Sequence, residues 1–270
     1  MYLQNLHTHT SFCDGAHFPE EIILTALEKG FSSIGFSDHS YTYYSREYAM
    51  LGDNTEAYKK EVLRLKEKYK DRIKIYLGLE FDIYSGLDTS GFDYSIGSVH
   101  YIKRGDGYID FDRNALLFDD VIKKYFCGFG YEFVKAYYHT LATLPDYGNF
   151  DIIGHFDVIS KHSEKYKFFD ISSKKYLNYA FEAAEALKGK IPFFEVNTGA
   201  IAKGYRTTPY PSIPILKELK RLGFGAVITS DCHDKTMLDC YFDEASELLK
   251  ECGFKEKYIF TDNGFIPVKL

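Results

Sequence analysis

The chain has 270 residues, of which 45% are hydrophobic and 27% are charged, and its formal net charge is −6. This length suits a single α/β domain with a large core, and the negative charge argues against a nucleic-acid-binding surface. There is no signal-peptide pattern at the N-terminus and no apolar run of membrane-spanning length, so we expect a cytoplasmic protein without a membrane partner. The five cysteines are scattered, which indicates reduced thiols.

The predicted elements alternate between strands and helices. In chain order we expect a strand at 1–9, a helix at 19–29, strands at 33–36, 73–81, 94–100 and 152–155 with helices at 55–69 and 119–141 between them, a helix at 174–187, a strand at 192–197, a helix at 214–222, a strand at 226–230, a helix at 243–251 and a short strand at 258–260. About seven strand–helix units predict a single-domain α/β barrel, with an open doubly wound sheet as the competing arrangement.

The segment 101–130 interrupts this alternation. It is long, rich in aromatic residues, mixed in charge, and directly follows His100. Long connections in compact domains are often functional loops. The segment therefore either covers a site or is an ordinary surface insertion.

Two histidines one residue apart, His7 and His9, end the first predicted strand. Side chains at positions i and i+2 of a strand point to the same face, so the two imidazoles should project together. Such a pair is either half of a metal site or a pair of surface histidines near a flexible terminus.

Further polar residues lie at or just after the C-terminal ends of the predicted strands, where α/β barrels carry their active sites. With the first pair, the set is His7, His9, His39, Glu80, His100, His155, Glu195, Asp231 and His233. Imidazole and carboxylate groups are ligands for zinc, manganese or iron, and one ion takes about four protein ligands. The set therefore predicts two or three divalent metal ions, which favours hydrolysis of a phosphate ester.

A second group is suited to binding an anion. Asn197 follows Glu195, and after it comes the stretch 203–206, which ends in Arg206. A guanidinium group can bind two phosphate oxygens at once, although a lone arginine is more often a surface charge. Asp14 and His39 could bind a third ion or move a proton, although an Asp-Gly pair such as 14–15 is often only a turn.

With these residues in place, the chain resembles the PHP (polymerase and histidinol phosphatase) superfamily, and most closely its monofunctional histidinol-phosphate phosphatase branch. The matching segments are HTHT at 7–10, FCDG at 12–15, FSDH at 36–39, GLEFD at 78–82, GSVH at 97–100, GHFD at 154–157, EVNT at 195–198 and SDCH at 230–233. The resemblance spans nearly the whole chain and implies a distorted (β/α)7 barrel.

The resemblance also implies a metal cluster of zinc, manganese or iron. The implied ligands of the first ion are His7, His9, Glu80 and Asp231. Glu80 would bridge to a second ion held by His100 and His155, and His39 and His233 would hold a third. Asp14 is the expected further ligand of the third ion, with His17 as the alternative.

The implied reaction is hydrolysis of L-histidinol phosphate to L-histidinol and phosphate, with metal-activated hydroxide attacking phosphorus. The expected catalytic residues are Asp14, His39 and Arg206, and the expected substrate-binding residues are Arg206, Lys161, Glu195 and Asn197. We expect Asp14 and His39 to deliver a proton to the leaving alkoxide, and Arg206 to stabilise charge on the phosphoryl oxygens.

One departure from the branch concerns the residues after the GHFD segment. Phosphatases of this type often carry an arginine there, whereas this chain has Lys161, which supplies charge without bidentate geometry. The alternatives are therefore a PHP phosphoesterase acting on another small phosphomonoester, a phosphotyrosine or a nucleotide, and a non-catalytic metal-binding domain. The oligomeric state is open.

Overall fold

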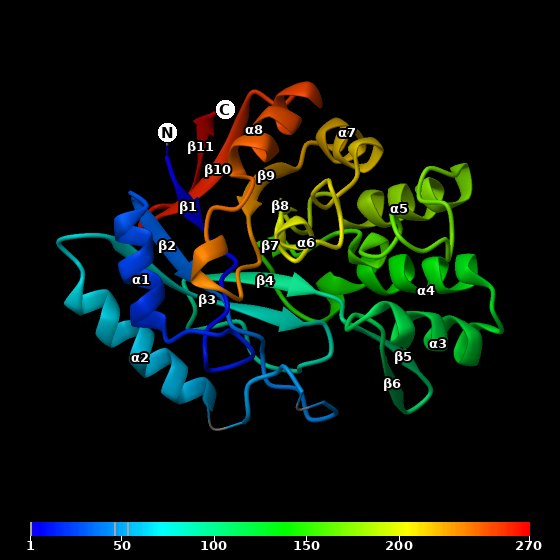
Figure 1. The fold of residues 1–270 in the computed structure, drawn as a ribbon, viewed down its shortest axis with the longest axis horizontal. Helices are drawn as coiled ribbons and strands as arrows, with labels where there is room; N and C mark the ends of the chain where they lie inside the picture. The colour runs from blue at the N-terminus through cyan, green and yellow to red at the C-terminus, as the bar shows by residue number, and fades with distance from the viewer. Residues whose placement is uncertain (1, 46, 53) are drawn as a thin grey trace.

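The computed structural model describes residues 2–45, 47–52 and 54–270. Its centre is one sheet of seven parallel strands in the order β1-β2-β3-β4-β7-β8-β9 (Figure 1). These strands are β1 (Gln4–Asn5), β2 (Ser33–Phe36), β3 (Lys74–Asp82), β4 (Tyr94–Ser98), β7 (Ile152–Ile153), β8 (Phe193–Asn197) and β9 (Gly225–Thr229). The seven predicted strands of the sheet are therefore present, although β1 and β7 are shorter than expected.

The two edges of the sheet meet just beyond β1 and β9. Thr8 forms a parallel bridge with Cys232, in which the His9 amide donates to the Cys232 carbonyl (2.8 Å) and the Cys232 amide donates to the His7 carbonyl (3.1 Å). The sheet is thus a nearly closed barrel, which confirms the barrel prediction over the open doubly wound sheet.

Helices surround the barrel (Figure 1). They are α1 (Pro19–Glu28), α2 (Asn54–Lys68), α3 (Ala115–Phe126), α4 (Gly130–Ala142), α5 (Lys174–Leu187), the short α6 (Gly199–Ala202), α7 (Ile213–Leu222) and α8 (Phe242–Glu251), with 3₁₀ turns at Leu144–Asp146, Val158–Ser160 and Lys235–Met237. Helix α7 shows why they pack inward: Ile215, Leu216, Leu219 and Leu222 are buried, at helical spacing. None of the described helices is long and apolar enough to cross a membrane.

The predicted helix at 119–141 was wrong, because the chain forms two helices there, α3 and α4. Cys127 and Gly128 between them have φ angles of 53° and 79°, in the left-handed region that ends helices. Upstream, Tyr101–Arg104 (β5) and Gly107–Asp110 (β6) form an antiparallel hairpin that the sequence did not reveal. The segment 101–130 is therefore a hairpin followed by a helix.

A buried hydrophobic cluster fills part of the barrel interior. It is formed by Leu6, Tyr76, Tyr94, Ile96, Ile152 and Val227. The hairpin of β10 (Glu256–Thr261) and β11 (Gly264–Lys269) packs Phe260 and Phe265 against this cluster, near both chain termini (Figure 1).

Candidate active site

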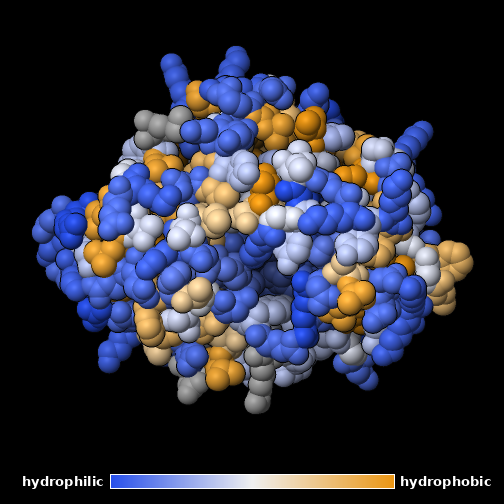
Figure 2. All heavy atoms as spheres, viewed as in Figure 1, coloured by the Kyte–Doolittle hydropathy of each residue, from blue (hydrophilic) through white to orange (hydrophobic). Residues whose placement is uncertain are grey.

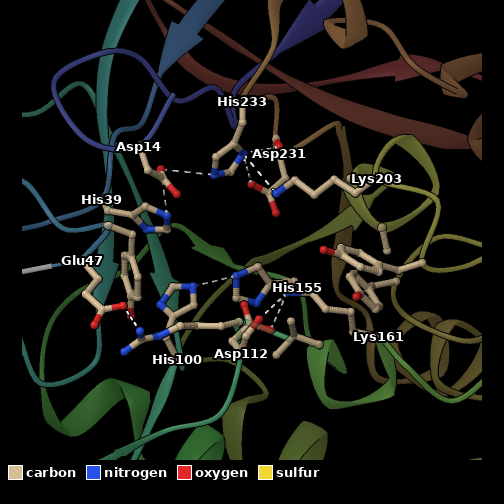
Figure 3. A pocket seen from close by; sticks show the side chains of 17 residues that line it. Asp14, His39, Glu47, His100, Asp112, His155, Lys161, Lys203, Asp231 and His233 are labelled. Carbon is tan, nitrogen blue, oxygen red and sulfur yellow. Dashed lines mark hydrogen bonds and ion pairs between the residues drawn. The ribbon is translucent and has the colours of Figure 1, made fainter. Parts of the chain in front are cut away.

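The strand-end histidines and acids converge at the carboxyl end of the barrel (Figure 3). They come from six of the seven strands or from the loops after them, which is how a parallel barrel gathers residues distant in sequence. The residues brought together are His7, His9, Asp14, His39, Glu80, His100, His155, Asp231 and His233. These are the nine residues predicted as metal ligands.

Glu80, on β3, lies at the centre of this cluster. Its Oε2 is 2.7 Å from His39 Nδ1 and 3.3 Å from His7 Nε2, and its Oε1 is 3.0 Å from His155 Nε2 and 3.4 Å from His100 Nε2. Burial alone would raise the pKa of Glu80, but the neighbouring imidazoles hold it well below its usual range. Glu80 is therefore an ionised carboxylate whose two oxygens face different pairs of histidines.

Asp231 completes a group with His7 and His9 on one side of Glu80. Its Oδ1 is 3.2 Å from His9 Nε2 and 3.8 Å from His7 Nε2. Burial, together with the neighbouring His233 and His39, lowers the pKa of His9. A neutral imidazole beside ionised carboxylates is the donor set that a divalent cation requires.

Asp14 joins the group formed by His39 and His233. Its Oδ1 is 3.3 Å from His233 Nε2 and 3.7 Å from His39 Nε2. His17, the alternative, instead lies beside the carboxylates of Glu21 and Asp234 at 3.7 and 3.4 Å. The geometry therefore favours Asp14 over His17 in this group.

The donor atoms themselves indicate that the cluster suits cations. His7 Nε2, His9 Nε2 and Glu80 Oε2 are buried and have no hydrogen-bond partner among the described residues. Buried polar atoms are nearly always paired, because leaving one unpaired is costly. Three such atoms that face one another fit a site built for metal ions.

Glu195, predicted to bind substrate, lies behind His7. Its Oε2 accepts hydrogen bonds from His7 Nδ1 (2.8 Å) and Thr229 Oγ1 (2.7 Å), and its Oε1 accepts from the His155 amide (2.5 Å) and Asn197 Nδ2 (2.8 Å). Its side chain is fully buried and does not line the pocket. Glu195 therefore orients His7, a role typical of carboxylates next to metal-binding histidines.

Asn197, also predicted to bind substrate, is buried as well and does not line the pocket. Its side-chain amide donates to Glu195, and its carbonyl oxygen accepts from the Gly199 amide (2.8 Å). Asn197 therefore holds Glu195 and the start of α6 in place, and its position argues against a substrate contact.

Asp82 lies beside His100 as Glu195 lies beside His7. It was not among the residues predicted from the sequence. Its Oδ2 accepts from the His100 amide (3.3 Å) and lies 3.4 Å from His100 Nδ1. A signal was available: Asp82 follows Glu80 by two positions on the same strand, so both side chains point to the same face.

A pocket of about 410 Å³ opens directly onto the cluster. Figure 2 shows a hollow surrounded mostly by hydrophilic residues on this face. The charged side chains that line it, besides the cluster, are Glu47, Asp112, Arg113, Lys161 and Lys203. Lys161 was predicted as a substrate-binding residue, and Lys203 lies in the stretch that the sequence marked as anion-binding. Glu47, Asp112 and Arg113 lie in loops without a recognisable motif.

Lys161 lies at the pocket wall, where its Nζ donates to the carbonyl (2.6 Å) and Oδ1 (2.7 Å) of Asp112. Lys203 also lines the pocket, with its Nζ 3.2 Å from His233 Nδ1. Both lysines can therefore face an anion held at the metal cluster (Figure 3).

Arg206, predicted as both catalytic and substrate-binding, lies outside the pocket lining. Its side chain is buried, and its guanidinium group donates to Ser160 Oγ and to Thr208 Oγ1 (3.0 Å) and lies 3.9 Å from Glu164 Oε1. These partners occupy the group that was expected to bind phosphate. The structure therefore places Arg206 as a support for the chain around Ser160.

We expect Arg206→Gln to act on stability. Removing a buried, hydrogen-bonded charge should lower the free energy of unfolding by about 3 kcal/mol, measured by urea denaturation. The KM for substrate should change by less than about threefold, because the side chain does not reach the pocket. A large rise in KM at unchanged stability would restore the substrate-binding prediction.

The sequence and the fold of the chain are similar to those of known proteins. The family model for the PHP domain matches residues 5–199. The chain belongs to the PHP family. This confirms the resemblance drawn from the sequence segments.

The relatives of this PHP chain span nearly its full length. A protein named histidinol-phosphatase from Lactococcus lactis is 27% identical, over 95% of this chain and 93% of the relative. A histidinol-phosphatase from Bacillus subtilis is 28% identical, over 84% of this chain and 92% of the relative. A crystal structure of the Lactococcus lactis histidinol phosphate phosphatase with zinc, L-histidinol and phosphate superposes with a TM-score of 0.71 at 22% identity, covering 97% of this chain and 98% of that chain.

Proposed function

We propose that this PHP chain is a metal-dependent phosphomonoesterase that hydrolyses L-histidinol phosphate to L-histidinol and phosphate, in histidine biosynthesis and in the cytoplasm. The observation that carries the proposal is the convergence of nine imidazole and carboxylate side chains at one end of the barrel, where six of them line a pocket that two lysines also line. The full-length similarity to proteins named histidinol-phosphatase supports the choice of substrate.

We assign the ligands to three ions of zinc, manganese or iron. His7, His9, Glu80 and Asp231 would hold the first, Glu80 with His100 and His155 the second, and Asp14 with His39 and His233 the third. Bound there, divalent ions would supply Lewis-acid charge to a phosphoryl group and lower the pKa of water.

The chain's own cations are placed to bind the phosphate. Lys203, Lys161 and Arg113 all line the pocket. An ammonium group forms strong charge-assisted hydrogen bonds to phosphoryl oxygens. Lys161 and Lys203 therefore take the phosphate-binding part that the sequence assigned to Arg206.

The pocket wall also carries negative charge, which suits the amine of the substrate. L-Histidinol phosphate bears a primary ammonium group as well as a phosphate. Glu47 and Asp112 line the pocket, and each is paired with a cation, Arg113 and Lys161 respectively. A wall with both signs of charge matches a substrate with both signs.

Asp14 and His39 are our candidates for handing a proton to the leaving alkoxide. Both line the pocket, and Asp14 Oδ1 lies 3.7 Å from His39 Nε2. Side chains that protonate a leaving group must reach it within hydrogen-bonding distance. Because both side chains line the pocket, a leaving group bound in it would lie beside them.

We also propose that the segment 101–130 covers one side of this site. Asp112 and Arg113, which follow β6, line the pocket. Tyr108 of β6 stacks on Tyr44 at a ring distance of 4.0 Å, and the Tyr44 hydroxyl donates to Asp82 beside His100. The segment is thus connected to the metal cluster through two tyrosines.

The test is phosphate release from L-histidinol phosphate beside p-nitrophenyl phosphate, phosphotyrosine and a nucleoside monophosphate, with zinc or manganese supplied. We expect a strong preference for L-histidinol phosphate in kcat/KM. Preference for another ester would keep the mechanism and reject the substrate. Inertness toward every ester, with metal bound, would indicate a non-catalytic metal-binding domain.

Lys203→Met should lower kcat/KM for L-histidinol phosphate by about 10- to 100-fold, because one charged hydrogen bond to phosphate is lost. Lys203→Arg should retain a larger share of the activity. The exposed Lys188, paired with Glu185 on the outside of the barrel, provides the matched control Lys188→Met. Equal kcat/KM values for the two methionine variants would exclude Lys203 from phosphate binding.

A further inference from the structure

The outer ring nitrogens of the metal-cluster histidines differ in their partners. His7 Nδ1 donates to the Glu195 carboxylate (2.8 Å), and His100 Nδ1 lies 3.4 Å from the Asp82 carboxylate. His9 Nδ1 lies 3.4 Å from the sulfur of Cys13 instead. His9 thus has a thiol in the place where the other two have a carboxylate.

The Cys13 thiol leads in turn to a carboxylate. Its Sγ donates to Asp38 Oδ1 at 2.8 Å. Asp38 is fully buried and is fixed by the Thr10 amide (2.7 Å) and the Thr10 hydroxyl. A carboxylate held from the other side in this way gives the thiol a fixed direction for its proton.

We propose that Cys13 is a positioning residue for His9: its sulfur accepts the Nδ1 proton of His9 while its own proton is donated to Asp38. This relay fixes the tautomer in which His9 Nε2 is free of a proton and faces Asp231 and Glu80, 3.2 and 3.6 Å away. The inference rests on the proposed metal site, since only a metal-binding His9 requires that tautomer. It assigns a role to the cysteine of the FCDG segment.

The competing interpretation is that His9, Cys13 and Asp38 bind an ion of their own, because their donor atoms lie close enough together. The hydrogen bonds argue against it. Both oxygens of Asp38 are already engaged by Thr10, and one of them also accepts from the thiol. The Cys13 sulfur also lies beside Nδ1 of His9, whereas Nε2 of the same ring faces Glu80 and Asp231.

The direct test is nitrogen-15 NMR of the histidine rings in the zinc-loaded wild-type chain. We expect His9 to carry its proton on Nδ1 and to bind zinc through Nε2. Zinc bound to His9 Nδ1 would overturn the proposal, because that nitrogen could not then donate a proton to Cys13. A thiolate-to-metal charge-transfer band in the cobalt-substituted protein would also overturn it, because Cys13 would then be a metal ligand.

Variants supply the second test. Cys13→Ala should retain zinc about 10- to 100-fold less tightly against a competing chelator, and Cys13→Ser, which keeps a donor and acceptor, should recover part of this loss. Cys240, another partly exposed free thiol, gives the control Cys240→Ala, expected to match wild type.

Two failures are distinguishable in these experiments. If Cys13→Ala retained zinc against the chelator as tightly as the wild-type chain does, the role of Cys13 would be overturned and the proposed function would stay intact. A wild-type chain that binds no zinc, manganese or iron would overturn the proposed function and the relay with it.

Discussion

Replacing Glu80 with glutamine is expected to reduce phosphate release by about 10²- to 10⁴-fold. The carboxylate lies between four histidines at 2.7–3.4 Å, and it is the residue that the first and second ions would share. Glutamine would leave a neutral and weaker oxygen donor in the place where the two ions would share a carboxylate. The measurement is kcat at saturating L-histidinol phosphate, with metal per chain determined on the same sample.

The control for this prediction is Glu61→Gln on α2, where a partly exposed carboxylate pairs with Arg64. It removes the same charge outside the site, so kcat should stay within about twofold of wild type. If Glu80→Gln kept more than about a tenth of wild-type activity with a full metal complement, Glu80 could not be the shared ligand.

Gly78→Ala is expected to lower the free energy of unfolding by about 3 kcal/mol, through overpacking of the barrel interior. A Cβ atom at Gly78 would lie 2.2 Å from the ring of Tyr94. That ring cannot move aside freely, because the Tyr94 hydroxyl donates to the carbonyls of Leu6 (2.5 Å) and Phe36 (3.1 Å). Urea denaturation measures the loss.

Two further variants make this test specific. Gly107→Ala in β6 is the control, because its Cβ would meet nothing closer than 3.6 Å and stability should change by no more than about 0.5 kcal/mol. Adding Tyr94→Leu to Gly78→Ala should cost less than the sum of the two single changes, since the smaller side chain relieves the clash. Equal denaturation midpoints for Gly78→Ala and wild type would show that the interior has room to spare.

The metal cluster could be predicted because its residues obey a positional rule. His39, Glu80 and His155 are far apart in the sequence, yet each lies at the carboxyl end of a strand, and a parallel barrel brings those ends together. The alternation of strands and helices was also readable, since hydrophobic periodicity and helix-ending glycines mark it locally.

The substrate-facing residues could not be predicted in the same way. Sequence chemistry shows that Arg206 and Glu195 are charged, but only the packing shows that Ser160 and His7 already engage them. Glu47 and Arg113 reach the pocket from loops whose course depends on tertiary contacts. The division of 119–141 into two helices was missed for a similar reason, because Cys127 adopts a left-handed conformation that its residue type does not favour.

The most direct test of the account is a metal titration of the chelated, metal-free chain that records zinc bound and phosphate released from L-histidinol phosphate together. The account predicts negligible turnover without metal and a return of activity only as the sites built around Glu80 fill, with more than one ion bound per chain. Full turnover of L-histidinol phosphate by the metal-free chain would contradict it.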